Sequence, residues 1–349
     1  MYSHPTIRDV ARVAGVHFTT VSMALRGHAG IPAVTRDRIV AVASRIGYVR
    51  NRVFAALSNQ RSNKGGDHFR PRIAYLTNRS PEEGFLMYWH FQSLIAGARR
   101  QAEALGYDFE VLFIDKGYHN SQTLGPYLKK NSITGVIIGA FEPDRAEIEL
   151  DWNEFCAVKI DSRHMKPPLN FVASDQMNDV RDAHAHLYAL GYRRIGLAVG
   201  QVDEESTDGL HLSGLILARQ DHPSAEPIPP LFFPHGTTEK SAIPLIRSYV
   251  IEHGLDVILC NWTNIRNMIE RAGFECPREV ACACVCLPRR TRNLAGIVTN
   301  LEGVGERVTS LLVALLRMEQ KGVPDFATRT YVRGKWSDGS SASPRARKD

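Results

Sequence analysis

The sequence predicts an all-α helix-turn-helix head followed by a larger α/β body. Within the first 50 residues, three short amphipathic patterns recur at helical spacing and stop at glycines. A polar, glycine-containing stretch without periodicity follows at residues 58–72. Beyond it, short β-branched runs alternate with longer helical patterns. At 349 residues, the chain is long enough for two or three such units.

The first two helices of the head are joined by a tight turn. Thr6 is a suitable N-cap for the first helix, which ends at Gly15. In a second helix over 18–27, the inward residues are Val21, Ala24 and Leu25, and the residues on the opposite face are Phe18, Thr19, Ser22 and Met23. Two helices with a glycine-containing turn between them make a helix-turn-helix.

A third helix completes the head. We expect it to begin at Thr35 as N-cap and to end at Gly47. Its apolar residues at inward spacing are Ile39, Val40, Val42, Ala43 and Ile46.

Positive charge is concentrated in this part of the chain. Ten Lys or Arg residues and two Asp residues give residues 1–64 a formal charge of +8, so the rest of the chain carries −2 of the total of +6. A basic head on a slightly acidic body is typical of a protein whose head meets a polyanion. The second helix of a helix-turn-helix enters the major groove of DNA. The alternative is a helical cap that packs on the body and presents a solvated basic face.

Several motifs of the head resemble the lactose-repressor/galactose-repressor (LacI/GalR) family of bacterial transcription factors. They are "TIRDVARVAGVHFTTVSMALRG", "VTRDRIVAVASRIGYVRN" and "RVFAALSNQRS", in this order and spacing. The resemblance implies that "NRVFAAL" is a hinge helix that orders on operator DNA, with Leu57 wedged between base pairs in the minor groove. Such a wedge unstacks a base step and kinks the duplex.

Three departures from the family matter, and one is the absence of the Pro that the family tends to have at Arg50 or its neighbour. The family commonly has an Arg where this chain has Met23, so that position can make apolar contact but cannot bind guanine in a bidentate manner. His17 replaces a small hydroxyl residue, so we expect a weaker cap on the second helix. Phe18 can alternatively pack against the first helix. The candidate DNA-binding residues are Thr6, Phe18, Thr19, Thr20, Ser22, Met23, Arg26, Thr35, Asn51, Arg52 and Leu57.

The body alternates strand and helix patterns, which favours parallel sheets flanked by helices. The predicted strands are "RIAYLTN", "FEVLFID", "TGVIIGA", "CAVKID", "NFVASD", "RRIGLAVG", "LDVILCN" and "VACACVCL". This order resembles the family's two-lobed core, which is similar to type I periplasmic binding proteins. The resemblance implies one lobe at 72–173 plus 300–325 and the other at 174–299 plus 326–336.

The predicted organisation is a helix-turn-helix domain at 1–50, a hinge helix and linker at 51–71, an effector-binding and dimerisation domain at 72–336 and a disordered tail at 337–349. Ligands of open α/β sheets bind at the carboxyl ends of strands. The candidate effector-binding residues are therefore Tyr88, Trp89, Asp161, His211, Asn261, Trp262 and Asn300. Aromatic faces with a few polar groups suit a sugar-like ring, although core packing explains each aromatic equally well. The family's sugar binders commonly carry an Arg and an Asp where this chain has His211 and Trp262.

We expect no metal, no cofactor and no enzymatic activity. Cys282, Cys284 and Cys286 share one face of a strand, but this spacing suits a packed wall better than a tetrahedral zinc site. His184 and His186 lie two apart on a helix and therefore point to different faces. Without an export signal or a membrane-length apolar run, we expect a cytoplasmic protein with free thiols.

The expected function is a transcriptional regulator, a repressor, that binds a near-palindromic operator as a homodimer and responds to a small-molecule effector, for example a sugar. Two alternatives remain open. A solute-binding module would share the body without binding DNA, and an enzyme built on the Cys-rich strand would require a metal.

Overall fold

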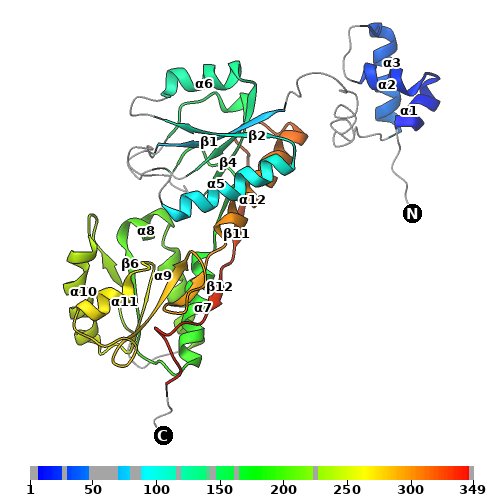
Figure 1. Ribbon diagram of the computed structural model, residues 1–349. Coiled ribbons are helices and arrows are strands. Elements are labelled where there is room, and N and C mark those ends of the chain that lie inside the picture. Colours follow the sequence, from blue (N-terminus) through cyan, green and yellow to red (C-terminus); the bar gives the residue numbers. More distant parts are fainter. Residues whose placement is uncertain are drawn as a thin grey trace. The chain divides into compact units, whose positions relative to one another are not determined.

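The computed structural model describes residues 7–25, 30–46, 70–78, 88–114, 119–139, 141, 147–160, 165–222 and 227–345. The chain divides into two compact units, Met1–Phe69 and Arg70–Asp349. The first contains the helices of the head, and the second contains two α/β lobes (Figure 1). This is the predicted fold class, an all-α head with a two-lobed α/β body.

The head contains the helices α1 (Ile7–Ala14), α2 (Phe18–Ala24) and α3 (Ala33–Arg45). Helices this short are marginal alone, so a shared core must stabilise them. Each helix contributes to that core, whose fully buried centre consists of Val10, Val21 and Ile39. The remaining core residues are Ala11, Ala14, Ala24, Val42 and Ala43. The predicted inward faces of α1 and α2 are therefore present.

Two details of α3 differ from the prediction. The helix begins at Ala33 with Pro32 in the N-cap position, so Thr35 lies inside the first turn and is not the cap. Proline is favoured at helix starts because its φ is fixed and its missing N–H is not needed there. Val40 is 45% exposed and lies outside the core, because the helix already directs Ile39, Val42 and Ala43 inward.

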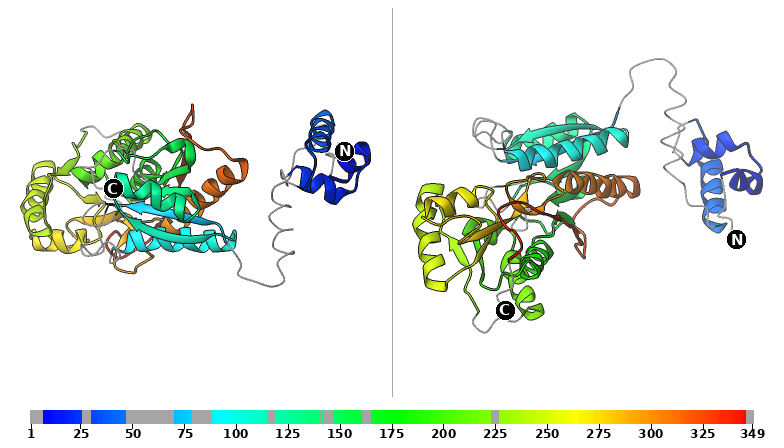
Figure 2. Two further views of the ribbon diagram at one scale, coloured as in Figure 1. Left: turned by 90° about the horizontal axis from the view of Figure 1, so that it is seen from above. Right: turned by 60° about the horizontal axis from the view of Figure 1, so that its bottom comes forward.

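The first lobe of the second unit contains an all-parallel sheet in the order β11-β5-β4-β3-β1-β2. Its strands are β1 (Arg72–Thr77), β2 (Asp108–Phe113), β3 (Ile133–Ile138), β4 (Cys156–Ile160), β5 (Phe171–Ser174) and β11 (Arg329–Val332). Its helices are α5 (Trp89–Ala104), α6 (Ser121–Lys130) and α12 (Leu301–Met318), with a 3₁₀ turn at Trp152–Glu154. Helices α5 and α12 lie side by side on one face, and α6 covers the other (Figures 1 and 2).

The second lobe repeats this design around a sheet in the order β12-β10-β9-β8-β6-β7. Its strands are β6 (Ile195–Gly200), β7 (Leu231–Phe233), β8 (Val257–Cys260), β9 (Ala281–Leu287), β10 (Ala295–Val298) and β12 (Lys335–Ser337). Its helices are α7 (Gln176–Ala189), α8 (Gln201–Ser206), α9 (Leu210–Asp221), α10 (Glu239–His253) and α11 (Ile265–Arg271). Helices α7 and α9 pack on one face, and α10 and α11 on the other.

The chain passes between the lobes three times, after β5, after β10 and after β11. The position predicted for the third passage is wrong. Residues 326–336 were expected in the second lobe, but β11 extends the first sheet as the parallel partner of β5. The passage therefore lies between Val332 and Lys335, where β12 begins its antiparallel pairing with β10.

The expected disordered tail at 337–349 is also wrong for its described part, which ends at residue 345. Ser341 is fully buried. Its hydroxyl donates to the carbonyl oxygen of Cys282 at 2.7 Å and accepts from the backbone N–H of Ala295 at 2.9 Å. A serine-rich segment is typical of a tail, but here a serine satisfies backbone groups that would otherwise be buried without partners.

Candidate DNA-binding surface and effector site

The outward face of α2 is polar and partly apolar. Phe18 is 43% exposed, Thr19 is exposed, and Thr20 and Met23 are half-buried. Because Val21 and Ala24 turn into the core, these four side chains are left facing away from it. Hydroxyl groups can hydrogen-bond to base edges, and an apolar tip can contact a thymine methyl group.

His17 supplies the cap that the sequence leaves in doubt. Its Nδ1 accepts the backbone N–H of Thr19 at 3.5 Å and lies 2.8 Å from the Thr19 hydroxyl oxygen. Its ring lies 4.4 Å from that of Phe18, centre to centre. An imidazole nitrogen thus takes the place of the small hydroxyl residue. The long bond to Thr19 agrees with the expected weaker cap.

Basic side chains occur on α1 and α3 as well. Arg12 is exposed and forms an ion pair of 2.7 Å with Asp9, while Arg38 and Arg45 on α3 are exposed. Of the candidate DNA-binding residues, Thr6, Arg26, Asn51, Arg52 and Leu57 lie outside the described residues, and the side chain of Ser22 is not described either. The predicted hinge helix therefore stays a prediction.

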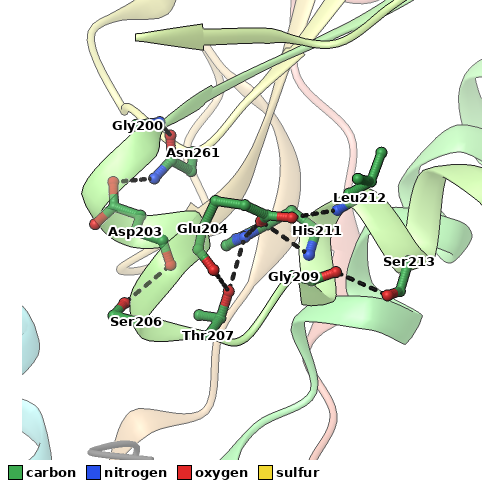
Figure 3. Close-up of polar contacts among 10 residues, drawn as sticks. All are labelled: Gly200, Asp203, Glu204, Ser206, Thr207, Gly209, His211, Leu212, Ser213 and Asn261. Atoms are coloured by element: carbon green, nitrogen blue, oxygen red, sulfur yellow. Dashed lines mark hydrogen bonds and ion pairs between the residues drawn. The ribbon is translucent and has the colours of Figure 1, made fainter. Parts of the chain in front are cut away.

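In the second lobe, a polar cluster follows the carboxyl ends of β6 and β8 (Figure 3). The side-chain amide of Asn261 donates to Oδ2 of Asp203 at 2.6 Å, and its oxygen accepts the backbone N–H of Gly200 at 3.3 Å. These parallel strands are neighbours in the sheet, so their ends bring Gly200 and Asn261 together. A side chain at Gly200 would collide with Asp203, since a Cβ there would lie 2.6 Å from Oδ2.

Trp262 places an aromatic ring beside this cluster. Its ring lies 4.6 Å from that of Phe233 at the end of β7, and it packs against the core while remaining half-exposed. A Cβ at Gly200 would lie 3.6 Å from the indole Nε1 of Trp262. The carboxyl ends of β6 and β8 thus bring together a carboxylate, an amide and an indole, those of Asp203, Asn261 and Trp262.

His211 was predicted to contact the effector, but the structure gives it an internal partner. It is only 5% exposed, and its Nδ1 lies 2.8 Å from Oε2 of Glu204. The same carboxylate accepts the backbone N–H groups of His211 and Leu212, at 3.2 and 2.9 Å (Figure 3). Burial opposes ionisation of Glu204, but these hydrogen bonds outweigh it and lower its pKa. The contact between Glu204 on α8 and His211 on α9 thus holds these two helices together.

The other candidates lie apart from this cluster. Tyr88 is exposed in the N-cap position of α5, and Trp89 is half-buried against the core of the first lobe. Asn300 is exposed, and its side-chain oxygen caps α12 through the N–H of Gly303 at 3.0 Å. Asp161 lies outside the described residues. Of the six predicted residues that the structure describes, it therefore brings Asn261 and Trp262 together and leaves the other four apart from them.

Asp203 and Glu204 were missed by the sequence analysis. The signal was present, because Gly200 ends a predicted strand and an acidic segment begins three residues later, close to the carboxyl end of that strand, where ligands bind in open α/β sheets. No group of three or more His, Cys, Asp or Glu residues in the described part of the chain could hold a metal ion. Among the described helices, none is long and apolar enough to cross a membrane.

A helix-turn-helix head followed by a two-lobed α/β body is the architecture of a class of DNA-binding regulators. Residues 6–51 match the family model described as bacterial regulatory proteins, lacI family. The resemblance to the LacI/GalR family is thus confirmed, and this segment belongs to it.

Curated relatives extend the similarity into the body. The lactose operon repressor of Escherichia coli (strain K12) is 25% identical over 212 residues, which cover 60% of this chain and 54% of that protein. The transcriptional regulator GalR of Streptococcus thermophilus is 26% identical, over 59% of this chain and 57% of that protein. The matched region thus spans little more than half the length of these relatives. Both are transcriptional regulators.

Solved structures share the fold over nearly the whole chain. A transcriptional regulator CelR–cellobiose complex has a TM-score of 0.61 at 19% identity and covers 97% of this chain and 99% of that chain. The lac repressor dimer bound to operator and the anti-inducer ONPF has a TM-score of 0.57 at 18% identity, covering 98% and 100%.

Proposed function

We propose that this protein is a transcriptional repressor that binds operator DNA as a homodimer and is controlled by a small-molecule effector. The observation that carries the proposal is α2, which turns hydroxyl and apolar side chains outward within a segment that matches the lacI family model. A helix presented in this way fits the major groove, where base edges are read.

The roles of the head residues follow from their chemistry. Thr19 and Thr20 hydrogen-bond to base edges, Met23 contacts a thymine methyl group, and Phe18 adds apolar contact. The exposed arginines of α1 and α3 bind phosphates and position the head without reading sequence. Base specificity at the Met23 position therefore differs from that of a family member with arginine there.

The effector site we propose is the cluster of Asp203, Asn261 and Trp262. Oδ2 of Asp203 accepts a hydrogen bond from Asn261, and a carboxylate has a second oxygen with which it can accept further hydrogen bonds. A carboxylate oxygen, an amide and an aromatic ring together suit a polyhydroxylated ring such as a sugar. The fold shared with a regulator solved as a cellobiose complex supports this ligand class.

Control of DNA binding requires that the effector prefer one arrangement of the lobes. A ligand shifts an equilibrium only by its differential affinity for the two states, and couplings between sites typically amount to about 1–3 kcal/mol. The three passages between the lobes are the segments where such a rearrangement is absorbed.

The test is selection of bound duplexes from a randomised pool, using the full-length protein at fixed moderate salt. We expect a near-palindrome whose half-sites lie about 34–36 Å apart or a multiple of this distance. Affinity for the selected duplex should fall steeply with rising salt, because phosphate neutralisation releases counterions. If no sequence is enriched with or without a panel of sugars, and a sugar still binds the body, the solute-binding alternative replaces this proposal.

A further inference from the structure

Two thiols of the second lobe lie in direct contact. The sulfur atoms of Cys276, in the loop after α11, and Cys282, in β9, are 3.7 Å apart. Both residues are buried. Neither belongs to the head or to the proposed effector site, and burial of a small apolar thiol does not by itself require a second thiol beside it.

The pair lies beneath a short surface loop. Glu275 and Arg278 on either side of Cys276 are exposed and form an ion pair of 2.5 Å. On the inner side, the carbonyl oxygen of Ser341 lies 3.9 Å from the Cys276 sulfur and accepts the backbone N–H of Cys282 at 2.9 Å. The Cys276 thiol is thus held between an exposed loop and a C-terminal segment whose backbone contacts both cysteines.

We propose that Cys276 and Cys282 form a site of reversible oxidation, at which hydrogen peroxide converts the two thiols into an intramolecular disulfide. The sulfur atoms must approach from 3.7 Å to the S–S bond length of about 2.05 Å. Cys276 lies in a loop rather than in a regular element, so the loop can supply this movement while β9 stays in the sheet.

The chemistry proceeds in two displacements. The Cys276 thiolate attacks one peroxide oxygen, the O–O bond breaks, and the departing hydroxide takes up a proton to become water. The Cys282 sulfur then attacks the resulting sulfenic acid, the S–S bond forms, and the S–O bond breaks with release of a second water. The two thiols together lose two electrons and two protons, and one peroxide is reduced to two waters.

The environment assigns the attacking role to Cys276. A hydrogen bond from the Cys282 thiol, together with the positive charge of Arg266, lowers the pKa of Cys276 despite burial. The same hydrogen bond and burial raise the pKa of Cys282. The thiolate is the reactive form, so Cys276 reacts first and Cys282 resolves the intermediate.

Cys260 and Cys284 provide a comparison within the same core. They are Cα partners in neighbouring strands β8 and β9 and are fully buried. Burial raises the pKa of Cys260 to about 12 and that of Cys284 well above its ordinary value. These thiols should stay reduced under conditions that oxidise Cys276 and Cys282.

The test treats the full-length protein with hydrogen peroxide, blocks the remaining thiols by alkylation and maps tryptic peptides. Trypsin cuts after Arg278, so a disulfide between Cys276 and Cys282 joins two otherwise separate peptides, and fragmentation identifies the sulfurs. We expect the titratable thiols in denaturant to fall from six to four, and dithiothreitol to restore them.

Variants make the assignment specific. Cys276→Ser and Cys282→Ser should abolish the joined peptide, whereas the matched control Cys260→Ser should retain it. If a variant fails to fold, the peptide map of the oxidised wild-type protein still shows whether the disulfide forms. Retention of all six thiols, irreversible oxidation of Cys276 to sulfinic acid, or a disulfide of Cys282 with any other cysteine would each overturn the proposal.

Discussion

Met23 is the residue at which we expect this protein to differ most from its relatives in DNA sequence preference. It is half-buried on α2, with its neighbours Val21 and Ala24 in the core, so a longer side chain at 23 can extend outward. Met23→Arg should move preference toward guanine at one symmetric pair of operator positions, because a bidentate arginine discriminates by about 1–3 kcal/mol. Repeating the duplex selection with this variant measures the change.

The control for Met23→Arg is Val40→Arg. Val40 is 45% exposed on α3, so the substitution adds the same charge to the head outside the proposed reading face. Val40→Arg should strengthen binding to all duplexes alike without changing the selected sequence. If Met23→Arg also leaves the sequence unchanged, Met23 does not face bases.

Asp179 and His184, both on α7, should give opposite dependences of stability on pH. Asp179 accepts the backbone N–H of Gly334 at 2.9 Å, but burial and the nearby Asp175 and Asp182 raise its pKa to about 7. Since this is above the unfolded value, its contribution to stability is greatest at low pH and falls as pH rises from about 4 to 7. Burial, together with the charges of His222 and Arg219, lowers the pKa of His184 to about 4, so its contribution falls as pH drops from about 6.5 to 4.

Between pH 4 and 6.5 the contributions of Asp179 and His184 to the unfolding free energy change in opposite directions and partly cancel. A variant that removes one of the two groups should therefore show the pH dependence of the other. In Asp179→Asn, unfolding free energy should rise with pH across this window. In His184→Leu, which also removes a buried Nδ1 without a hydrogen-bond partner, it should fall as pH rises to about 7. Each effect should reach up to ~3 kcal/mol, from about 1.4 kcal/mol per pKa unit.

Urea unfolding at intervals from pH 4.5 to 8 provides the measurement. Asp325→Asn is the control, because Asp325 is exposed and its substitution should leave the pH profile of the wild type. Profiles of Asp179→Asn and His184→Leu that run parallel to the wild type would contradict the assignment.

At the scale of elements, the contact between α5 and α12 depends on two glycines. A Cβ at Gly97 would lie 2.1 Å from the carbonyl oxygen of Glu302, and one at Gly305 would lie 2.1 Å from that of Leu94. Gly97→Ala should therefore lower the unfolding free energy by about 1–3 kcal/mol, although alanine is the better helix former by about 1 kcal/mol. Thermal unfolding compares it with Ala96→Leu, an exposed neighbour whose larger side chain should change stability by only about 0.5 kcal/mol. Equal stability of Gly97→Ala and wild type would show that the helices can separate at no cost.

Central strands were predictable because continuous apolar runs mark strands buried on both faces, as in β1, β6 and β8. Four short strands were not predicted. β7 and β12 have three residues each, β11 has residues that are exposed or half-buried in alternation, and β10 has four residues and lies inside the second sheet. At sheet edges, pairing depends on partners distant in sequence more than on local composition.

The candidate site was predictable to a similar degree. Asn261 and Trp262 were predicted because β8 is a clear strand and ligands bind at the carboxyl ends of strands. Their position beside Asp203 follows only once the order of strands in the sheet is known. The burial of His211 was not predictable, because it depends on packing of α9 against the carboxylate of Glu204, which no local pattern records. Leu57 lies outside the described residues, so the hinge wedge stays a prediction.

For the molecule as a whole, the proposed function requires that the effector site and the head be thermodynamically coupled. A sugar from the panel that raises the melting temperature of the protein identifies a ligand, because binding to the folded state stabilises it by mass action. That sugar should change the affinity for the selected operator by about 5- to 150-fold, and operator DNA should change the affinity for the sugar by the same factor, since coupling of binding free energies is reciprocal.

Asp203→Asn should weaken sugar binding and remove the response while leaving operator affinity without sugar unchanged. Asp208→Asn, which removes the same charge from an exposed neighbouring position, should behave as wild type. Fluorescence anisotropy with labelled operator measures operator affinity with and without the sugar, and titration calorimetry measures sugar affinity with and without operator. An operator affinity that stays unchanged when the sugar is bound would contradict the proposed coupling.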